Sequence, residues 1–168
     1  MDNASLAKIG SQERPVPALK FGHGPMVKDV FYPVIERWLE DWWDLDGAGA
    51  RIVPEILPDE GVVTTHEGRP IVASFIYNKK GLDLSLHAYL VTDPQIKSTL
   101  RHAAVSEHIT VAVQHAESLG CTYQLWQTED PRFTDRLIKN HGFESATGRL
   151  STAYHISGGG PRLAALEE

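Results

Sequence analysis

The stretch from residue 61 to residue 143 constrains the fold most, because its pattern changes in a fixed order. It reads as a hairpin, a strand over 82–91, a long helix over 96–119, a strand over 123–128 and a short helix over 131–140. The strand runs through Asp93-Pro94 directly into the long helix. The first amides of a helix lack internal partners, and its dipole adds partial positive charge there. This junction therefore predicts a site for a cofactor that carries phosphates.

Hydrophobic alternation predicts the strands around this junction. Residues 61–66 and 70–78 read as two strands joined by the hairpin signal Glu67-Gly68-Arg69. The strand over 82–91 alternates, which predicts two faces. One face holds Leu84, Leu86, Ala88 and Leu90, and the other holds Ser85, His87, Tyr89 and Val91.

The flanking segments complete the expected domain. Residues 18–21 are expected to form a short strand, and 26–43 a helix that Pro33 should kink or restart. Residues 51–58 read as a proline-punctuated connection, and 143–145 and 152–156 as the last two strands, with Thr147-Gly148 in the turn. We expect flexible segments at 1–17 and 158–168 around a single domain over 18–157.

Composition excludes several classes of protein. A chain of 168 residues with 42% apolar and 23% charged residues suits one globular domain. No apolar run approaches the roughly 20 residues of a membrane span, so no membrane partner is expected. The net charge of -6, without a basic run, argues against nucleic acid as a partner. One cysteine, Cys121, fits a reducing compartment and favours a cytoplasmic location.

Three segments resemble motifs of the GNAT superfamily of N-acyltransferases. Residues 90–94, Leu-Val-Thr-Asp-Pro, resemble the end of the fourth strand of that family, where backbone groups pair with the pantetheine arm of acetyl-CoA. Residues 97–102 align without gaps with the pyrophosphate turn Arg/Gln-x-x-Gly-x-Gly/Ala. Residues 137–143 resemble the later motif Leu-Tyr-Glu-Lys-x-Gly-Phe.

The resemblance implies a fold and a cofactor. The fold would be α/β (α+β), with a central mixed, mostly antiparallel sheet of about seven strands flanked by helices. Acyl-CoA would be the co-substrate, acetyl-CoA in the usual case, and no metal would be needed. The backbone of Val91 and Thr92 would hold the thioester. The pyrophosphate would be held by the next turn, which contains Lys97, Ser98, Thr99, Leu100, Arg101 and His102.

The pyrophosphate turn departs from the family pattern. Both glycine positions are filled, by Leu100 and His102, although glycine is used where backbone must approach phosphate closely. Ser98 and Thr99 could still cap the helix start and offer hydroxyls. Lys97 and Arg101 could meet the phosphate charge directly.

Two further family positions are also changed. The tyrosine that often serves as the acid for the departing thiolate falls on Ile138, which cannot donate a proton, and a frequent asparagine falls on Pro131. These changes support an alternative, a non-catalytic binding or structural module in which the cofactor site has decayed. A closed turn filled by Leu100 and His102 would favour this alternative.

His87 is the preferred general base. In some family members a carboxylate lies ten residues before the pyrophosphate motif, and counting back ten from Lys97 gives His87. A histidine can accept a proton near neutral pH from an amine that attacks a thioester. Tyr89, expected on the same face, could replace the missing acid. The alternative is that both are packing residues of a half-buried strand.

The remaining histidines and the cysteine predict no further site. His108 and His115 could share a helix face, but none of the eight histidines has the i, i+4 spacing of a helical zinc site. Scattered surface histidines are the favoured interpretation. Cys121 has no base nearby in the sequence, which favours a buried structural thiol.

The sequence thus predicts an N-acyltransferase that moves an acyl group, most simply acetyl, from acyl-CoA to an amine. The amine acceptor could belong to a small molecule or to a protein. Nothing in the sequence selects between them, and a homodimer stays open. Substrate selection would come from the first helix, the loop over 51–61 and the late strands.

Overall fold

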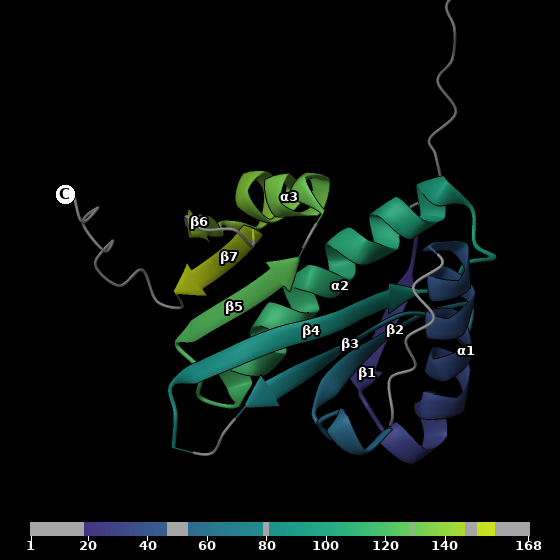
Figure 1. The fold of residues 1–168 in the computed structure, drawn as a ribbon, viewed down its shortest axis with the longest axis horizontal. Coiled ribbons are helices and arrows are strands. Elements are labelled where there is room, and N and C mark those ends of the chain that lie inside the picture. The colour runs from purple at the N-terminus through teal and green to yellow at the C-terminus, as the bar shows by residue number, and fades with distance from the viewer. Residues whose placement is uncertain (1–18, 47–53, 79–80, 129, 147–150, 157–168) are drawn as a thin grey trace, which may run out of the picture.

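The fold is a single seven-stranded sheet with helices on both faces (Figure 1). The computed structural model describes residues 19–46, 54–78, 81–128, 130–146 and 151–156. The strand order is β1-β2-β3-β4-β5-β7-β6. Neighbouring strands are antiparallel except β4 and β5, which are parallel. The expected α/β fold, with a mixed and mostly antiparallel sheet of about seven strands, is confirmed.

The element bounds follow the sequence pattern closely in the second half of the chain. The strands are β1 (Phe21–Pro25), β2 (Gly61–His66), β3 (Arg69–Asn78), β4 (Leu84–Thr92), β5 (Tyr123–Thr128), β6 (Glu144–Ala146) and β7 (Ser151–Ile156). The helices are α1 (Lys28–Asp46), the single 3-10 turn η1 (Pro54–Ile56), α2 (Ser98–Ser118) and α3 (Pro131–His141).

Several predictions for the flanking segments need correction. The first strand starts at Phe21, where the expected strand over 18–21 ends, because β1 pairs along β2 as far as Pro25. Helix α1 runs without interruption through Pro33, since its inner face packs on the sheet around Ile35 and Trp38. Within the connection predicted over 51–58, residues 54–56 form a 3-10 turn, and 51–53 lie outside the described residues. The expected flexible segments, 1–17 and 158–168, and the turn at 147–148 lie outside the described residues.

Two apolar clusters lie on opposite faces of the sheet. Helix α1 covers one face, where Ile35, Trp38 and Leu39 pack against Phe75 and Val91. Helices α2 and α3 cover the opposite face (Figure 1), in a cluster that includes Val72, Ile76, Ile109, Trp126, Leu137 and Phe143. The sheet is therefore covered on both faces, and its irregularities decide where a ligand can enter.

Among the described residues, no helix combines the length and the apolar character that crossing a membrane requires.

Strand β4 carries a β-bulge in its second half. Ala88 lies opposite Phe75 and Val91 opposite Ala73, so Tyr89 and Leu90 share one partner position on β3. Tyr89 has a φ of 51°, a left-handed conformation that is uncommon outside glycine. A bulge of this kind turns the strand and reverses its alternation beyond the extra residue.

A buried histidine joins α2 to the sheet beside the bulge. The Nδ1 atom of His108 lies 2.8 Å from the Thr64 hydroxyl, and its Nε2 atom lies 2.7 Å from the hydroxyl of Ser74, the residue opposite the bulge. Desolvation lowers the pKa of His108 to about 3, with smaller contributions from His23 and His87. The expectation of surface histidines is therefore wrong for His108, which is fully buried and neutral between two hydroxyls.

His108 predicts a stability that falls with acid. Its pKa is 6.5 when unfolded and about 3 when folded, so the unfolded chain binds the extra proton between these values. The contribution of His108 to the free energy of unfolding is therefore fully present above the unfolded pKa of 6.5, and it is lost as the pH falls toward 3. Linkage puts this loss at about 2 kcal/mol between pH 7 and pH 5. Urea unfolding should show a smaller loss for His108→Gln than for the natural chain. Parallel pH curves for the two proteins would contradict this account.

Candidate functional site

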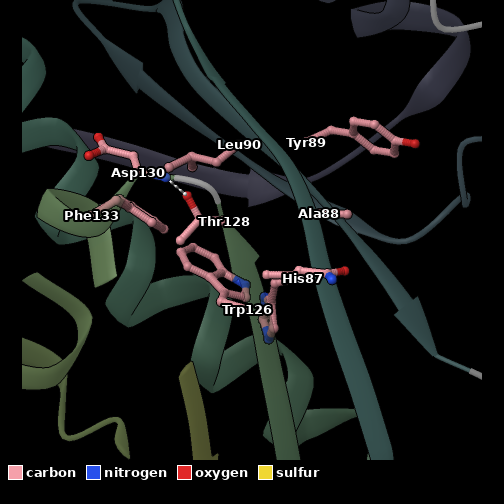
Figure 2. Close-up of a pocket in the computed structure, with 9 residues that line it drawn as sticks. His87, Ala88, Tyr89, Leu90, Trp126, Thr128, Asp130 and Phe133 are labelled. Atoms are coloured by element: carbon pink, nitrogen blue, oxygen red, sulfur yellow. Dashed lines mark hydrogen bonds between the residues drawn. The ribbon is translucent and has the colours of Figure 1, made fainter. Parts of the chain in front are cut away.

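The parallel strands β4 and β5 separate beyond one pair of residues. Their pairing runs from Leu84 with Tyr123 to His87 with Trp126, although both strands continue. Beyond that pair β4 is bonded to β3 and β5 to β7, which leaves a fork between them. The fork holds a cavity of about 380 Å³, which we call the fork cavity (Figure 2). Its walls include His87, Tyr89, Leu90, Trp126, Thr128, Asp130 and Phe133.

His87 lies at the closed end of the fork, and its ring orientation is fixed. It is buried, with its Nε2 atom 2.9 Å from Oε1 of Gln124. The amide nitrogen of Gln124 donates to the Val113 carbonyl at 3.2 Å, so Oε1 is the acceptor. His87 therefore donates through Nε2–H when neutral, and Nδ1 is its basic nitrogen. The Trp126 ring meets the imidazole edge-on at 5.0 Å.

Tyr89 does not share the face of His87, as the alternation had predicted. Its side chain packs in the cluster under α1, whereas His87 contacts Trp126 on the other face, and Figure 2 shows the two leaving β4 in different directions. The bulge causes this difference, because the extra residue reverses the alternation. Tyr89 borders a second cavity of about 400 Å³, the tyrosine cavity, which also includes Tyr77 and Gln127.

The tyrosine cavity carries hydroxyl groups. The Tyr77 ring centroid lies 6.5 Å from that of Tyr89, and its hydroxyl donates to the Ile56 carbonyl at 2.6 Å. Burial, followed by the neighbouring Tyr89, raises the pKa of the Tyr77 hydroxyl. The Tyr77 hydroxyl, which already donates to Ile56, can accept a hydrogen bond from a ligand, and a tyrosine hydroxyl such as that of Tyr89 can donate or accept one.

Val91 and Thr92, the expected thioester contacts, line none of the three described cavities. Both are buried, and the Thr92 carbonyl accepts a hydrogen bond from Nε1 of Trp42 at 2.8 Å. Leu90 lines the fork cavity in their place. The strand end thus meets the cavity one residue earlier than the resemblance implied.

The junction between β4 and α2 forms the predicted helix start. The first amide bonded within α2 is that of Arg101, 2.9 Å from the Lys97 carbonyl. The amides of Ser98, Thr99 and Leu100 precede that bond, as at the start of any helix. Ser98 and Thr99 do not cap the helix as predicted. The cap is Lys97, and its side chain makes no capping hydrogen bond.

A third and largest cavity, of about 810 Å³, lies between the start of α2 and α3. We call it the basic cavity. Of the six predicted pyrophosphate residues, Ser98, Arg101 and His102 line it, whereas Lys97, Thr99 and Leu100 do not. Of the two residues at the glycine positions, His102 therefore borders the cavity and Leu100 does not. Four cationic side chains line the cavity against the two carboxylates of Asp130 and Asp135; they are Arg101, Arg132, Arg136 and Lys139.

Both carboxylates of the basic cavity already have partners. Asp130 caps α3 by accepting from the Arg132 amide at 2.9 Å, and Asp135 pairs with Lys139 at 3.0 Å. The Arg136 guanidinium contacts the His102 ring at 2.8 Å. The cavity therefore has a net positive lining in a chain whose net charge is -6, which favours an anionic ligand.

Arg101 supports the junction from within the basic cavity. Its Nη2 atom donates to the carbonyls of Pro94 and Ile96, at 3.0 Å each. Its guanidinium lies over the Trp42 ring, 5.0 Å from the centroid. The carboxylate of Asp93 receives the Gln95 amide at 2.9 Å, which tightens the same turn. Arg101 thus holds the turn in place as well as adding charge.

The three cavities adjoin one another in a row. The basic cavity and the fork cavity share Leu90, Asp130 and Phe133. The fork cavity and the tyrosine cavity share His87, Ala88, Tyr89 and Gln127. A long ligand with an anionic end could therefore lie across the first two, with its other end close to a second ligand in the third.

Sequence reasoning missed the cations of α3 and two residues of the fork. Arg132, Arg136 and Lys139 are spaced by four and three residues, the spacing that places side chains on one helix face, so a signal was present. Gln124 and Trp126 gave no comparable signal, because their roles depend on strand pairing.

Other predicted positions behave as ordinary structure. Ile138, at the family tyrosine position, is exposed and lines none of these cavities. Cys121 is buried as predicted, and desolvation raises its thiol pKa. Within the described ranges, no group of three or more histidine, cysteine, aspartate or glutamate side chains could hold a metal ion.

Comparison with known proteins supports the fold. No protein-family model and no curated protein sequence matches the chain. Solved structures do match. An acetyltransferase from Streptococcus agalactiae aligns with a TM-score of 0.60 at 7% identity, over 81% of this chain and 98% of that one. A Salmonella typhimurium protein solved with acetyl-CoA as its cofactor aligns with a TM-score of 0.60 at 11% identity, over 86% and 99%.

A third match comes from a longer protein. N-acetylglutamate synthase from Neisseria gonorrhoeae, solved with coenzyme A and N-acetyl-glutamate, aligns with a TM-score of 0.60 at 13% identity. The match covers 83% of this chain and 35% of the synthase. At these identities the likeness concerns the fold, which is that of the acyl-CoA N-acyltransferases.

The contacts of Arg101 predict a role in stability. Arg101→Met should lower the free energy of unfolding by about 1–3 kcal/mol, because it removes two hydrogen bonds from a charged donor and the contact with Trp42. Urea unfolding measures the change, and amide hydrogen exchange should show faster opening of residues 95–97. The matched control is Lys97→Ala, an exposed cation at the same turn. Equal effects of the two substitutions would refute the supporting role of Arg101.

Proposed function

We propose that this chain, which has the fold of the acyl-CoA N-acyltransferases, moves an acyl group from acyl-CoA to an amine. The observation that carries the proposal is the row of adjoining cavities, positively charged at one end and centred on the fork between β4 and β5. Acetyl is the simplest acyl group for this chemistry. A protein that uses a soluble thioester also agrees with the cytoplasmic location expected from its single cysteine.

The phosphate groups of CoA are proposed to bind in the basic cavity. Its four cations and the first amides of α2 can neutralise a pyrophosphate and a ribose phosphate. The pantetheine arm would then pass Leu90 and Phe133, the residues common to both cavities, and end in the fork. The fork cavity volume falls in the roughly 300–1,000 Å³ range of small-ligand sites.

His87 is the proposed base, through Nδ1. The amine nitrogen attacks the carbonyl carbon of the thioester and forms a C–N bond. The C–S bond breaks with its electron pair on sulfur, and CoA leaves as a thiolate. His87 takes the surplus proton of the attacking nitrogen, directly or through one water, and returns it to the thiolate or to solvent. Gln124 keeps Nδ1 as the basic nitrogen by accepting from Nε2–H.

The amine acceptor is proposed to enter from the tyrosine cavity. This cavity borders His87 and Tyr89, so an amine there lies next to the closed end of the fork. Tyr89 is proposed to orient the acceptor with its hydroxyl, or to protonate the thiolate in place of the acid missing at Ile138. Holding both substrates side by side can supply much of the rate.

The alternative is a module that binds without catalysis. The filled glycine positions and Ile138 favour it, because each removes a feature of the family site. The basic cavity favours the enzyme, since it lies beside the start of α2 and is lined by four cations and not by Leu100. If the chain binds acetyl-CoA but acetylates none of a panel of amines, the non-catalytic module is the correct alternative.

Isothermal titration calorimetry with acetyl-CoA tests the proposed binding site of the cofactor. The chain should bind acetyl-CoA, and Arg132→Gln with Arg136→Gln should weaken binding at least tenfold at low salt, with a smaller effect at high salt. The matched control is Arg37→Gln, an exposed arginine on α1 outside the three cavities, which should bind normally. Absence of heat at millimolar acetyl-CoA would end the proposal.

Steady-state rates test the base. His87→Ala should lower kcat about 10²–10⁴-fold, the usual contribution of a general base, with nearly unchanged affinity for acetyl-CoA. Because the substitution empties the ring site, added imidazole should restore part of the rate. The control is His115→Ala, a histidine of α2 outside the three cavities. Equal losses of turnover and acetyl-CoA affinity, without rescue, would assign His87 a structural role.

A further inference from the structure

We infer that the indole N–H of Trp126 donates a hydrogen bond to the carbonyl oxygen of the bound thioester. This inference rests on the proposed function and adds a catalytic residue to it. Its basis is the surroundings of one buried polar atom. The indole nitrogen of Trp126 is inaccessible to solvent and has no hydrogen-bond acceptor among the residues that the structure describes.

An unpaired indole N–H in this position is costly. A buried donor left without an acceptor costs about 1–3 kcal/mol, so such groups are rare and call for a specific explanation, such as a catalytic role. Trp126 is 3% exposed and forms part of the wall of the fork cavity. Figure 2 shows the indole nitrogen on the edge of the ring that faces β4, across the fork.

Aromatic neighbours hold the indole in this orientation. Phe133 stacks on it with ring centroids 5.3 Å apart, and Phe143 lies at 6.3 Å on the same cluster. His87 meets it edge-on at 5.0 Å. A phenylalanine would make the same stacking contacts, so packing alone does not explain the nitrogen. These ring contacts fix the orientation of the indole, which a donor aimed at a reacting atom requires.

The strand register puts Trp126 where the acyl group should end. Trp126 pairs with His87, and this pair is the last before β4 and β5 separate. A CoA thioester whose phosphates lie in the basic cavity would reach the closed end of the fork with its acyl group. The indole N–H and the proposed base His87 would then lie on the two strands that border the same carbonyl.

The proposed role is to stabilise developing charge. When the amine attacks, the C=O π electrons move to oxygen and leave an oxyanion, which re-forms the carbonyl when the C–S bond breaks. A fixed N–H binds the oxyanion more strongly than the neutral carbonyl and so lowers the barrier. Removal of one such donor typically costs about 10²–10³ in kcat.

Indole ¹⁵N–¹H spectra test the contact on the natural chain. The chain has four tryptophans, and Trp126→Phe assigns the signal of Trp126. Saturating acetyl-CoA should move this signal downfield, and coenzyme A, which lacks the acyl carbonyl, should not. An unmoved signal in a sample that binds acetyl-CoA by titration would overturn the inference and leave the proposed function intact. An equal shift with coenzyme A would also overturn it.

Kinetics give the second readout. Trp126→Phe, and an isostere that has sulfur in place of the indole N–H, should each lower kcat about 10-fold or more, with KM for acetyl-CoA within about twofold. The isostere keeps the ring volume and so separates the N–H from packing. The control is Trp38→Phe, a buried tryptophan of α1 outside the three cavities, which should keep its kcat. A fully active isostere would overturn the inference, whereas absent binding of acetyl-CoA would instead refute the proposed function.

Discussion

The bulge at Tyr89 and Leu90 in β4 is the constraint on which the candidate site depends. It places a non-glycine residue in the left-handed region, a conformation that costs about 1–3 kcal/mol and is enriched at active and ligand-binding sites. Ser74, opposite the bulge, is hydrogen-bonded to the buried His108 of α2, which ties the irregular part of the sheet to the helix behind it. The bulge redirects β4 beyond His87, so that β4 and β5 separate there.

Once the strands separate, charge and shape order the rest of the site. The fork lies between a cavity with a net positive lining and a cavity bordered by two tyrosines. An acidic chain that gathers four cations between the start of α2 and α3 can attract a polyanion locally and repel it elsewhere. Arg101 links the two functions of this region, because its guanidinium supports the turn before α2 and also lines the basic cavity.

Periodicity predicted the order of elements, and β2 and β5 start and end where it placed them. The face of the sheet on which each side chain lies was harder to predict. A bulge depends on the register against β3, so alternation assigned Tyr89 to the wrong face. The burial of His108 was not predictable from the sequence either. A histidine is usually found at the surface, but His108 can be buried because both of its ring nitrogens form hydrogen bonds, with Thr64 and Ser74. The cations of α3 were visible as a one-face spacing, whereas the indole N–H of Trp126 gains meaning only from the tertiary packing.

A crystal structure of the chain with coenzyme A tests the central claim most directly. The account predicts the diphosphate at the start of α2 within the basic cavity, and the pantetheine arm between residues 88–90 of β4 and 126–128 of β5. The sulfur should lie near His87 and Trp126. Coenzyme A bound away from the fork, or β4 and β5 closed against each other beyond the pair of His87 and Trp126, would contradict it.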